Sequence, residues 1–287
     1  MPVQPTTRPV DLLAVDLDGT LLDSRGRLSP VNRAALHRAH EAGLKVVVCT
    51  GRSYTETRPV MQDIGLDLDA CVTVGGALVT DARSGLTLES QPIEPPVAGD
   101  TVDWLRQRGH TVLWLVDAQR FGHDGFVLEG RRRHPAIDRW LELAPVRMQA
   151  APRLPADEHA PLRLTIVDES HALAEISPGF RAAFEQRLTH NIIDVRSYGF
   201  SVIEAFAAGV DKWTGILRLC RRWGIDPART AAIGDDVNDV PMLRAAGIGA
   251  AVANAVPDAS EAARITVGRN DDGGVAEFVS LILDGEA

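Results

Sequence analysis

The chain has 287 residues, of which 45% are hydrophobic, and a formal net charge of −9 at neutral pH. A chain of this length and composition can bury a sizeable core in one large or two smaller domains. The negative charge argues against nonspecific binding to nucleic acid.

The cysteines and the N-terminal residues indicate the cellular compartment in which we expect the protein. Cys49, Cys71 and Cys220 form no Cys-x-x-Cys spacing, and their odd number fits a reducing cytosol better than a disulfide scaffold or a zinc site. Residues 1–8 lack an apolar signal core, and no apolar run is long enough to span a bilayer. We therefore expect a soluble, cytoplasmic protein with no membrane partner, and the sequence leaves its oligomeric state open.

The first part of the chain alternates between strand and helix patterns. Apolar runs predict strands at 12–16, 45–49 and 70–74, and amphipathic segments predict helices at about 31–42 and 54–64. Strands that alternate with helices indicate a parallel sheet.

The same alternation resumes after Lys212. Asp211 is placed to cap the N-terminus of a helix that continues to Trp223 and stops at Gly224. The further elements predicted here are strands at 230–233 and 249–252 and helices near 258–264 and 274–283. Both parts together predict a Rossmann-like, doubly wound and mostly parallel sheet.

The segment between these parts, residues 88–203, has a different texture, with prolines near its entrance and in its middle. Its strand candidates are 111–116, 126–129 and 162–167. We interpret the segment as one inserted α+β cap domain between two core segments, 1–87 and 204–287. Such a cap can close over a site and exclude water.

Hydroxyl or carboxylate groups follow three of the predicted strands. Asp16 to Thr20 follow the first strand, Thr50 and Gly51 the second, and Gly234 to Asp239 a later one. In an open α/β sheet, ligands bind outside the carboxyl ends of the strands. The three clusters are therefore expected to meet at one site.

The spacing of Asp16 and Asp18 has two other interpretations. A calcium loop needs a bidentate Glu at its twelfth position, which here is Arg27. An ordinary polar turn after a strand is the second alternative. Gly19 lets the chain leave the strand sharply, so both carboxylates can also serve one catalytic site.

Lysine usage singles out Lys212. Among 30 basic residues only Lys45 and Lys212 are lysines. This choice suggests a site that needs a compact ammonium rather than a planar guanidinium, although Lys45 shows that a lysine can also be incidental.

These segments together resemble the motifs of the haloacid dehalogenase superfamily phosphatases, of the Cof-type branch with a type IIB cap. Asp16 to Thr20 resemble the first motif, Thr50 the second, Lys212 the third and Gly234 to Asp239 the fourth. The resemblance runs from residue 11 to the stretch at 273–275. The chain departs from the branch at Gly75, where an Asn is frequent, and at Asp236, where a glycine is frequent.

The resemblance implies a Mg²⁺-dependent phosphatase that acts through an aspartyl-phosphate. Asp16 is then the nucleophile and Asp18 the proton-transfer group. The implied metal ligands are Asp16, the backbone carbonyl of Asp18, and Asp235. The implied phosphate-binding residues are Thr50, Gly51, Lys212 and Asn238, and Asp239 would orient Lys212 or the metal ligands.

Substrate selectivity is expected in the cap or at the rim of the core. Candidate residues are His123, Arg131, Arg133, Gly75 and Gly76, although an arginine run is often a solvated face and His123 can lie in a plain surface turn.

Resemblance alone favours a sugar phosphate as the substrate. A phosphosugar mutase with the same aspartyl-phosphate is the nearest alternative. A receiver-like phosphorylatable signalling module is a second alternative, against which Asp18 and the cap-sized insertion argue.

Overall fold

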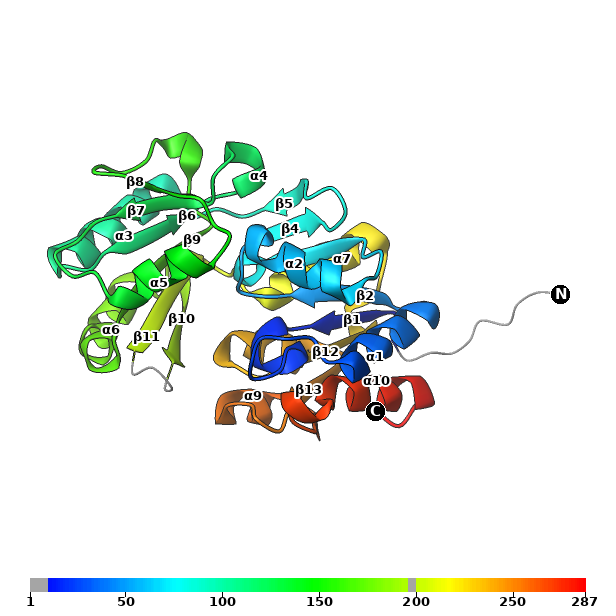
Figure 1. Ribbon diagram of the computed structural model, residues 1–287. Helices are drawn as coiled ribbons and strands as arrows, with labels where there is room; N and C mark the ends of the chain where they lie inside the picture. The colour runs from blue at the N-terminus through cyan, green and yellow to red at the C-terminus, as the bar shows by residue number, and fades with distance from the viewer. Residues whose placement is uncertain (1–9, 196–199) are drawn as a thin grey trace.

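The computed structural model describes residues 10–195 and 200–287, which form two domains, each built on its own sheet (Figure 1). The core domain contains both the first and the last strands, coloured blue and orange to red. The cap domain, coloured largely green, is the insertion between them. The predicted Rossmann-like core with an inserted α+β cap is therefore confirmed.

The core domain is built on a sheet of eight strands in the order β14-β13-β12-β1-β2-β3-β4-β5. The strands from β14 to β3 are parallel, and β4 and β5 extend the sheet as antiparallel strands. Their bounds, in chain order, are Leu12–Val15 (β1), Lys45–Cys49 (β2), Ala70–Thr73 (β3), Leu78–Asp81 (β4), Thr87–Ser90 (β5), Thr230–Gly234 (β12), Ile248–Val252 (β13) and Ile265–Val267 (β14).

Helices cover both faces of the core sheet. Leu13 and Val15 of β1 pack with α1, α2 and α10, whereas Leu12 and Ala14 pack with α7, α8 and α9. Successive side chains of a strand point to opposite faces, and burial on both faces explains why β1 is a continuous apolar run. The helix bounds are Pro30–Glu41 (α1), Tyr54–Ile64 (α2), Lys212–Trp223 (α7), Val240–Ala245 (α8), Pro257–Ala262 (α9) and Gly274–Asp284 (α10).

Local signals in the sequence determine where the helices begin and end. The Asp211 carboxylate accepts a hydrogen bond from the backbone N–H of Thr214 at 2.8 Å, which caps α7 as predicted. The helix ends at Gly224, whose φ of 67° is left-handed. Every strand and helix predicted from the sequence begins and ends within two residues of its observed bounds.

The cap domain has a six-stranded sheet in the order β10-β11-β9-β6-β7-β8. Val112 and Trp114 of β6 pack on one face with α3 and α6, and Leu113 and Leu115 pack on the other with α5. The bounds are Pro95–Gln107 (α3), Val112–Leu115 (β6), Ala118–Phe121 (α4), Gly125–Leu128 (β7), Pro135–Leu143 (α5), Met148–Ala150 (β8), Arg163–Glu169 (β9), Ser170–Phe184 (α6), Leu188–Val195 (β10) and Phe200–Ala207 (β11).

The sheets divide the chain a few residues later than the boundaries expected at 87/88 and 203/204. Strand β5 pairs with β4 as far as Ser90, so it belongs to the core sheet. Strand β11 pairs with β10 over its whole length to Ala207 and with β9 as far as Ala205, so it belongs to the cap sheet. Both expected boundaries fall inside strands, because hydrogen-bond partners rather than composition assign a strand to its sheet.

Within the described residues no helix is both long enough and apolar enough to cross a membrane. Cys49, Cys71 and Cys220 are buried and unbridged.

Candidate active site

Asp16 stands directly after β1, where the chain turns sharply at Gly19. The φ of Gly19 is +77°, and a Cβ built on it would lie 2.3 Å from Oδ2 of Asp235. A glycine is therefore required for the loop after β1 to approach the loop after β12. Two hydrogen bonds hold the contact: the Thr20 hydroxyl donates to Oδ1 of Asp235 at 2.8 Å, and the Asn254 amide donates to the Gly19 carbonyl at 2.8 Å.

Lys212 lies in the first turn of α7 and is only 1% exposed. Its Nζ donates to Oδ1 of Asp16 at 2.7 Å and to Oδ1 of Asp239 at 2.6 Å. Burial alone would lower the pKa of the Lys212 ammonium, but the two carboxylates outweigh burial and hold this pKa well above its ordinary value. Lys212 is therefore charged, and an ammonium has one further proton to donate.

Asp239 is completely buried and uses both of its carboxylate oxygens. Oδ1 accepts from Lys212, and Oδ2 accepts from the backbone N–H groups of Asp235 at 2.9 Å and Asp236 at 3.0 Å. Asp239 therefore positions the lysine and the loop after β12.

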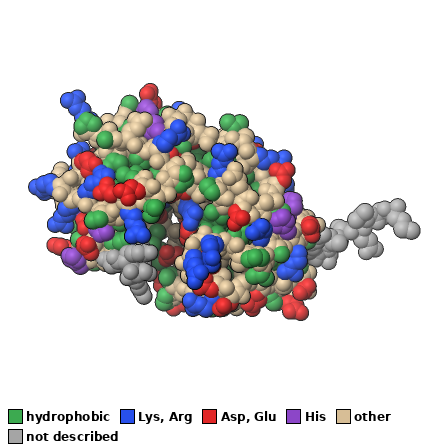
Figure 2. Space-filling model, viewed as in Figure 1, with side chains coloured by type: hydrophobic (Ala, Val, Ile, Leu, Met, Phe, Trp, Pro, Cys, Tyr) green, Lys and Arg blue, Asp and Glu red, His purple; other side chains and the backbone are tan. Residues whose placement is uncertain are grey.

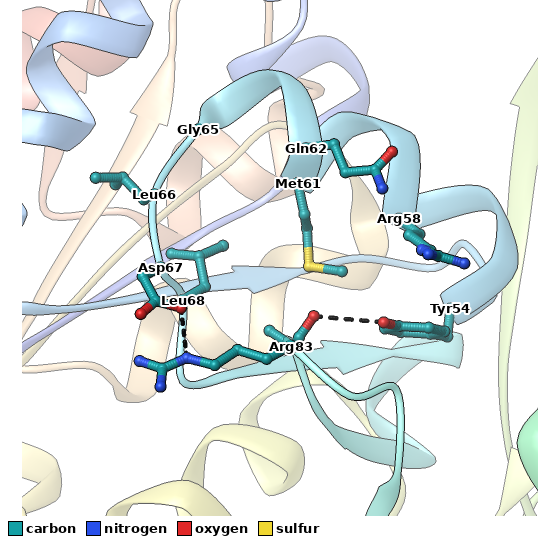
Figure 3. A pocket seen from close by; sticks show the side chains of 10 residues that line it. Tyr54, Arg58, Met61, Gln62, Gly65, Leu66, Asp67, Leu68 and Arg83 are labelled. Carbon is teal, nitrogen blue, oxygen red and sulfur yellow. Dashed lines mark hydrogen bonds and ion pairs between the residues drawn. The ribbon is translucent and has the colours of Figure 1, made fainter.

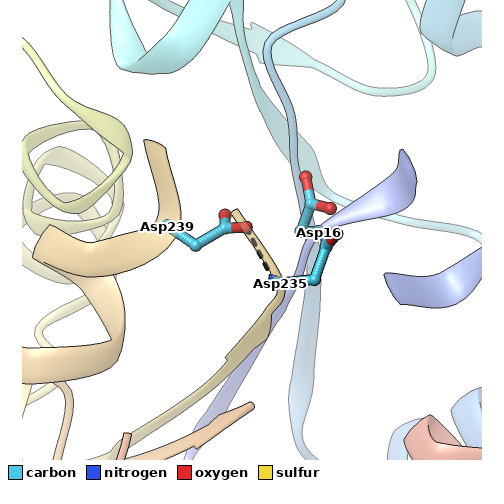
Figure 4. A group of neighbouring side chains, drawn as sticks. All are labelled: Asp16, Asp235 and Asp239. Carbon is cyan, nitrogen blue, oxygen red and sulfur yellow. Dashed lines mark hydrogen bonds between the residues drawn. The ribbon is translucent and has the colours of Figure 1, made fainter. Parts of the chain in front are cut away.

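Asp16, Asp235 and Asp239 offer carboxylate oxygens that lie within 4.8 Å of one another (Figure 4). Burial, followed by the Asp239 carboxylate, raises the pKa of Asp235 to about 7. The same two causes raise the pKa of Asp16 well above its ordinary value, against the opposing effect of Lys212. One ammonium thus faces three carboxylates, and the cluster needs a further positive charge or protons.

Thr50 and Gly51 follow β2 beside this cluster. Thr50 is buried, its backbone carbonyl accepts from the N–H of Gly75 at 3.0 Å, and its hydroxyl accepts from the N–H of Arg52 at 3.2 Å. Asn238 lies opposite, because a Cβ on Gly51 would be 3.8 Å from its Nδ2. The Asn238 Oδ1 is buried without a hydrogen-bond partner among the described residues.

The Asp18 side chain is 58% exposed and lines a cleft together with Asp16. Arg52 holds it through two hydrogen bonds, with Nε at 2.7 Å from Oδ2 and Nη2 at 2.5 Å from Oδ1. Such a bidentate pair fixes the orientation of a carboxylate. Sequence reasoning missed Arg52, although its place directly after Thr50 and Gly51 was a usable signal.

A cleft of about 270 Å³ joins these residues; we call it the central cleft. It is lined by core residues and by the cap residues Arg163, Ile193 and Glu204. The molecule is hollowed between the two domains in Figure 2. The core residues of the lining are Asp16, Asp18, Thr50, Gly51, Arg52, Glu56, Asp236 and Asn238.

Arg163 of β9 brings the cap into direct contact with the loop after β2. Its Nη1 donates to the Gly51 carbonyl at 2.6 Å and lies 2.6 Å from Oε1 of Glu204 on β11. Arg163 and Glu204 are each 7% exposed. Neither was predicted, because each appears in the sequence as one polar residue in an alternating strand.

The three cap residues proposed from the sequence do not line the central cleft. Arg133 is paired with Asp138, with 2.6 Å between Nη2 and Oδ1, and Arg131 is exposed and donates to the Gln107 carbonyl. His123 is neither in the cleft nor in a surface turn, since it is 8% exposed. Its ring packs against Phe126 at 4.7 Å and His159 at 5.9 Å between ring centroids.

Gly75 and Gly76 are also buried away from the lining of the central cleft. A Cβ on Gly75, whose φ is +62°, would lie 2.7 Å from Phe206, and a Cβ on Gly76 would lie 1.8 Å from the Asp211 carbonyl. Close packing therefore explains both glycines, and the structure gives no contact of either with the cleft.

A separate pocket of about 390 Å³ lies along α2 and the residues that follow it (Figure 3). Two contacts cross it: the Tyr54 hydroxyl donates to the Ala82 carbonyl at 3.3 Å, and Arg83 pairs with Asp67. It shares no lining residue with the central cleft and contains none of the clustered carboxylates.

The family model of the haloacid dehalogenase-like hydrolases matches residues 13–279. The chain therefore belongs to this family, as its motifs predicted. Within the family it is a Cof-type phosphatase, and its curated relatives bear this out.

Two of these relatives match nearly the whole chain. The pyridoxal phosphate phosphatase YbhA of Escherichia coli is 26% identical over 292 residues, covering 96% of this chain and 98% of that protein. The 5-amino-6-(5-phospho-D-ribitylamino)uracil phosphatase YwtE of Bacillus subtilis is 25% identical, covering 96% and 98%.

Solved structures agree on the fold. A haloacid dehalogenase-like hydrolase from B. subtilis superposes with a TM-score of 0.78 at 23% identity, covering 94% of this chain and 99% of that chain. One from Bacteroides thetaiotaomicron has a TM-score of 0.76 at 22% identity, covering 95% and 99%.

Proposed function

We propose that the protein is a Mg²⁺-dependent phosphomonoester hydrolase that acts on a small phosphorylated metabolite through an aspartyl-phosphate at Asp16. The observation that carries this proposal is the buried pair of Asp16 and Lys212 at the carboxyl end of β1. Once a bound cation has compensated the clustered carboxylates, Asp16 is an ionised nucleophile placed next to an ammonium that can bind phosphate oxygen.

The carboxylates suit a magnesium ion. Asp16 and Asp235 each use one oxygen, toward Lys212 and Thr20, and each keeps an oxygen with no partner among the described residues. Mg²⁺ prefers such hard oxygen ligands, and we expect the backbone carbonyl of Asp18 to be the third. The bound ion would supply the positive charge that lets an anionic nucleophile approach a phosphate dianion. Asp239, with both oxygens engaged, is proposed to orient Lys212 rather than to bind metal.

In the first step Asp16 attacks phosphorus, the bond to the leaving oxygen breaks, and Asp18 donates a proton to that oxygen. In the second step Asp18 takes a proton from water, which attacks the same phosphorus, and the bond to Asp16 breaks to release phosphate. Arg52 would keep the Asp18 side chain aimed at the leaving group. The groups proposed to hold the phosphate oxygens are the Thr50 hydroxyl, the Gly51 N–H, the third proton of Lys212 and the Asn238 amide.

We expect the cap to exclude water from the central cleft. The hydrogen bond from Arg163 to the Gly51 carbonyl joins a cap strand to the phosphate-binding loop, so the cap covers the central cleft in this conformation. A covered site favours transfer of phosphate to Asp16 over side reactions.

The names of the relatives support a small metabolite as the substrate. They include phosphatases of pyridoxal phosphate, of a phosphoribitylamino-uracil and of HMP-PP. The sugar phosphate favoured by resemblance stays a prediction. Membership of a phosphatase family removes the support for a receiver-like signalling module.

The test is a panel of phosphorylated sugars, vitamins and nucleotides assayed for inorganic phosphate with Mg²⁺ and with a chelator. We expect metal-dependent phosphate release from at least one ester and none from the Asp16→Asn variant. A mutase would instead return the phosphate to a second position of a sugar. Sustained release from Asp16→Asn at the wild-type rate would contradict the proposal.

A further inference from the structure

A second cleft, of about 530 Å³, opens beside the central cleft, and we call it the aromatic cleft. It shares Arg52 and Glu56 with the central cleft, so the two clefts adjoin at these two side chains. Arg139 also lines it. Its apolar lining consists of Ala136, Trp140, Leu143, Ala144, Pro145 and Phe200, nearly all from α5 and the residues after it.

Trp140 presents a fixed, apolar ring in this cleft. Its indole N–H donates to Oε1 of Glu56 at 2.8 Å. The other oxygen of Glu56 accepts from the backbone N–H and the hydroxyl of Ser53, at 3.0 and 2.8 Å. Because the only polar atom of the indole is engaged, the ring offers a ligand its apolar face alone.

Two more apolar groups complete the surface. The Phe200 ring lies against His134, with 5.2 Å between ring centroids. Leu143 is 74% exposed, the highest value among the large hydrophobic residues that the structure describes as exposed. An exposed leucine in a cleft that contains two aromatic rings is a surface suited to a flat apolar ligand.

Arg139 gives the cleft one positive charge. It is exposed, and it forms no ion pair or hydrogen bond within residues 10–195 and 200–287. Arg52 and Glu56, by contrast, are already bonded to Asp18 and to Trp140 and Ser53. Arg139 is therefore the cation of this cleft that remains available to a ligand.

We propose, resting on the phosphatase function above, that the aromatic cleft receives the leaving group of the substrate, and that this group carries a flat heteroaromatic ring with an anionic substituent facing Arg139. A sugar would set its hydroxyl groups against alanine, proline and leucine side chains, and the shared polar residues are already engaged. The expected substrate class is thus a phosphate ester of a heteroaromatic alcohol rather than a sugar phosphate.

The test compares three primary alkyl phosphates: pyridoxine 5′-phosphate, glucose 6-phosphate and glycerol 3-phosphate. Their leaving alcohols are chemically alike, so differences in kcat/KM report on binding of the rest of the molecule. We expect Leu143→Asp to lower kcat/KM for pyridoxine 5′-phosphate about tenfold and that for glycerol 3-phosphate less than about twofold. Leu154→Asp is the matched control, since Leu154 is another exposed cap leucine, at 42%, outside this cleft.

Arg139 is tested in the same way. Arg139→Ala should raise KM for pyridoxine 5′-phosphate more than kcat changes, because the charge contacts the ring and not the reacting phosphorus. Arg153→Ala, an exposed cap arginine outside the cleft, should change neither.

Direct binding of unphosphorylated pyridoxine, measured by calorimetry, separates the two proposals. Loss of pyridoxine binding in Leu143→Asp, with no ester of the whole panel of phosphorylated sugars, vitamins and nucleotides hydrolysed by the wild type, would keep the subsite and overturn the phosphatase proposal. Hydrolysis of all three esters with equal kcat/KM, unchanged by Leu143→Asp, would keep the phosphatase and overturn the subsite. A preference for glucose 6-phosphate would likewise overturn the subsite.

Discussion

The Lys212 ammonium lies 2.6 Å from a carboxylate oxygen of Asp239, and the exposed fractions of the two side chains are 1% and 0%. The same ammonium reaches Asp16, so Asp239 and Asp16 together determine the position of Nζ. Replacing a buried charge in such a group leaves its partners unpaired, at a cost of about 3–5 kcal/mol.

Lys212→Arg should therefore reduce kcat by at least about tenfold although the charge is retained, because a planar guanidinium cannot take the place of Nζ between two carboxylates. Lys212→Met should in addition lower the free energy of unfolding, which denaturant titration measures. Lys45→Arg, at the exposed start of β2, is the matched control. Wild-type turnover and phosphate affinity in Lys212→Arg would show that the ammonium has no part in the site.

Arg52→Ala should impair proton transfer rather than phosphate binding, since Arg52 orients Asp18. We expect kcat to fall much more for an alkyl phosphate than for 4-nitrophenyl phosphate, whose leaving group needs little protonation. Arg58→Ala, an exposed arginine of α2 outside the central cleft, serves as the control. An equal loss for both esters would argue against this role of Arg52.

Gly19→Ala should weaken Mg²⁺ binding, because the new Cβ would collide with the Asp235 carboxylate at 2.3 Å. Gly26→Ala separates this collision from backbone strain: Gly26 has a φ of +73°, and a Cβ there meets nothing within 4 Å. Backbone strain should cost both variants about 1 kcal/mol of stability, and the collision should cost Gly19→Ala more. The magnesium dependence of activity should shift only in Gly19→Ala. The same shift in both variants would refute the argument from close approach.

The affinity for Mg²⁺ should fall with decreasing pH. In the metal-free protein the pKa of Asp235 is raised to about 7, chiefly by burial, so this carboxyl holds a proton below that pH. A ligand carboxylate must be deprotonated, so affinity should rise as pH increases through about 7, with release of protons. Calorimetry between about pH 5.5 and about pH 8 measures this dependence. A constant affinity over this range would contradict it.

Much of the site could be predicted from the sequence because its parts follow buried strands. Asp16, Thr50 and Asp235 each come directly after an apolar run, and parallel strands bring their carboxyl ends to one edge. Asp211 and Gly224 marked the ends of α7 through local chemistry alone. Predictions that rest on short-range signals of this kind need no knowledge of tertiary contacts.

The cap side of the site could not be predicted in this way. Arg163 and Glu204 are 41 residues apart and meet only because β9 pairs with β11. The arginine run containing Arg131 and Arg133 looked functional because of its charge density, yet Arg133 is neutralised locally by Asp138. A run of charged residues in the sequence indicates only that the segment is exposed to solvent. Which charged side chains face the cleft depends on how the strands pair.

The most direct test of the central claim is to trap the covalent intermediate. The enzyme is mixed with a hydrolysed ester and Mg²⁺, quenched in acid within one turnover, reduced with borohydride and mapped by mass spectrometry. Borohydride converts an acyl phosphate to an alcohol, so the account predicts homoserine at position 16 in the wild type and no reduced residue in Asp16→Asn. Reduction at another residue, or phosphate release with no covalent intermediate under these conditions, would contradict the assignment of Asp16 as the nucleophile.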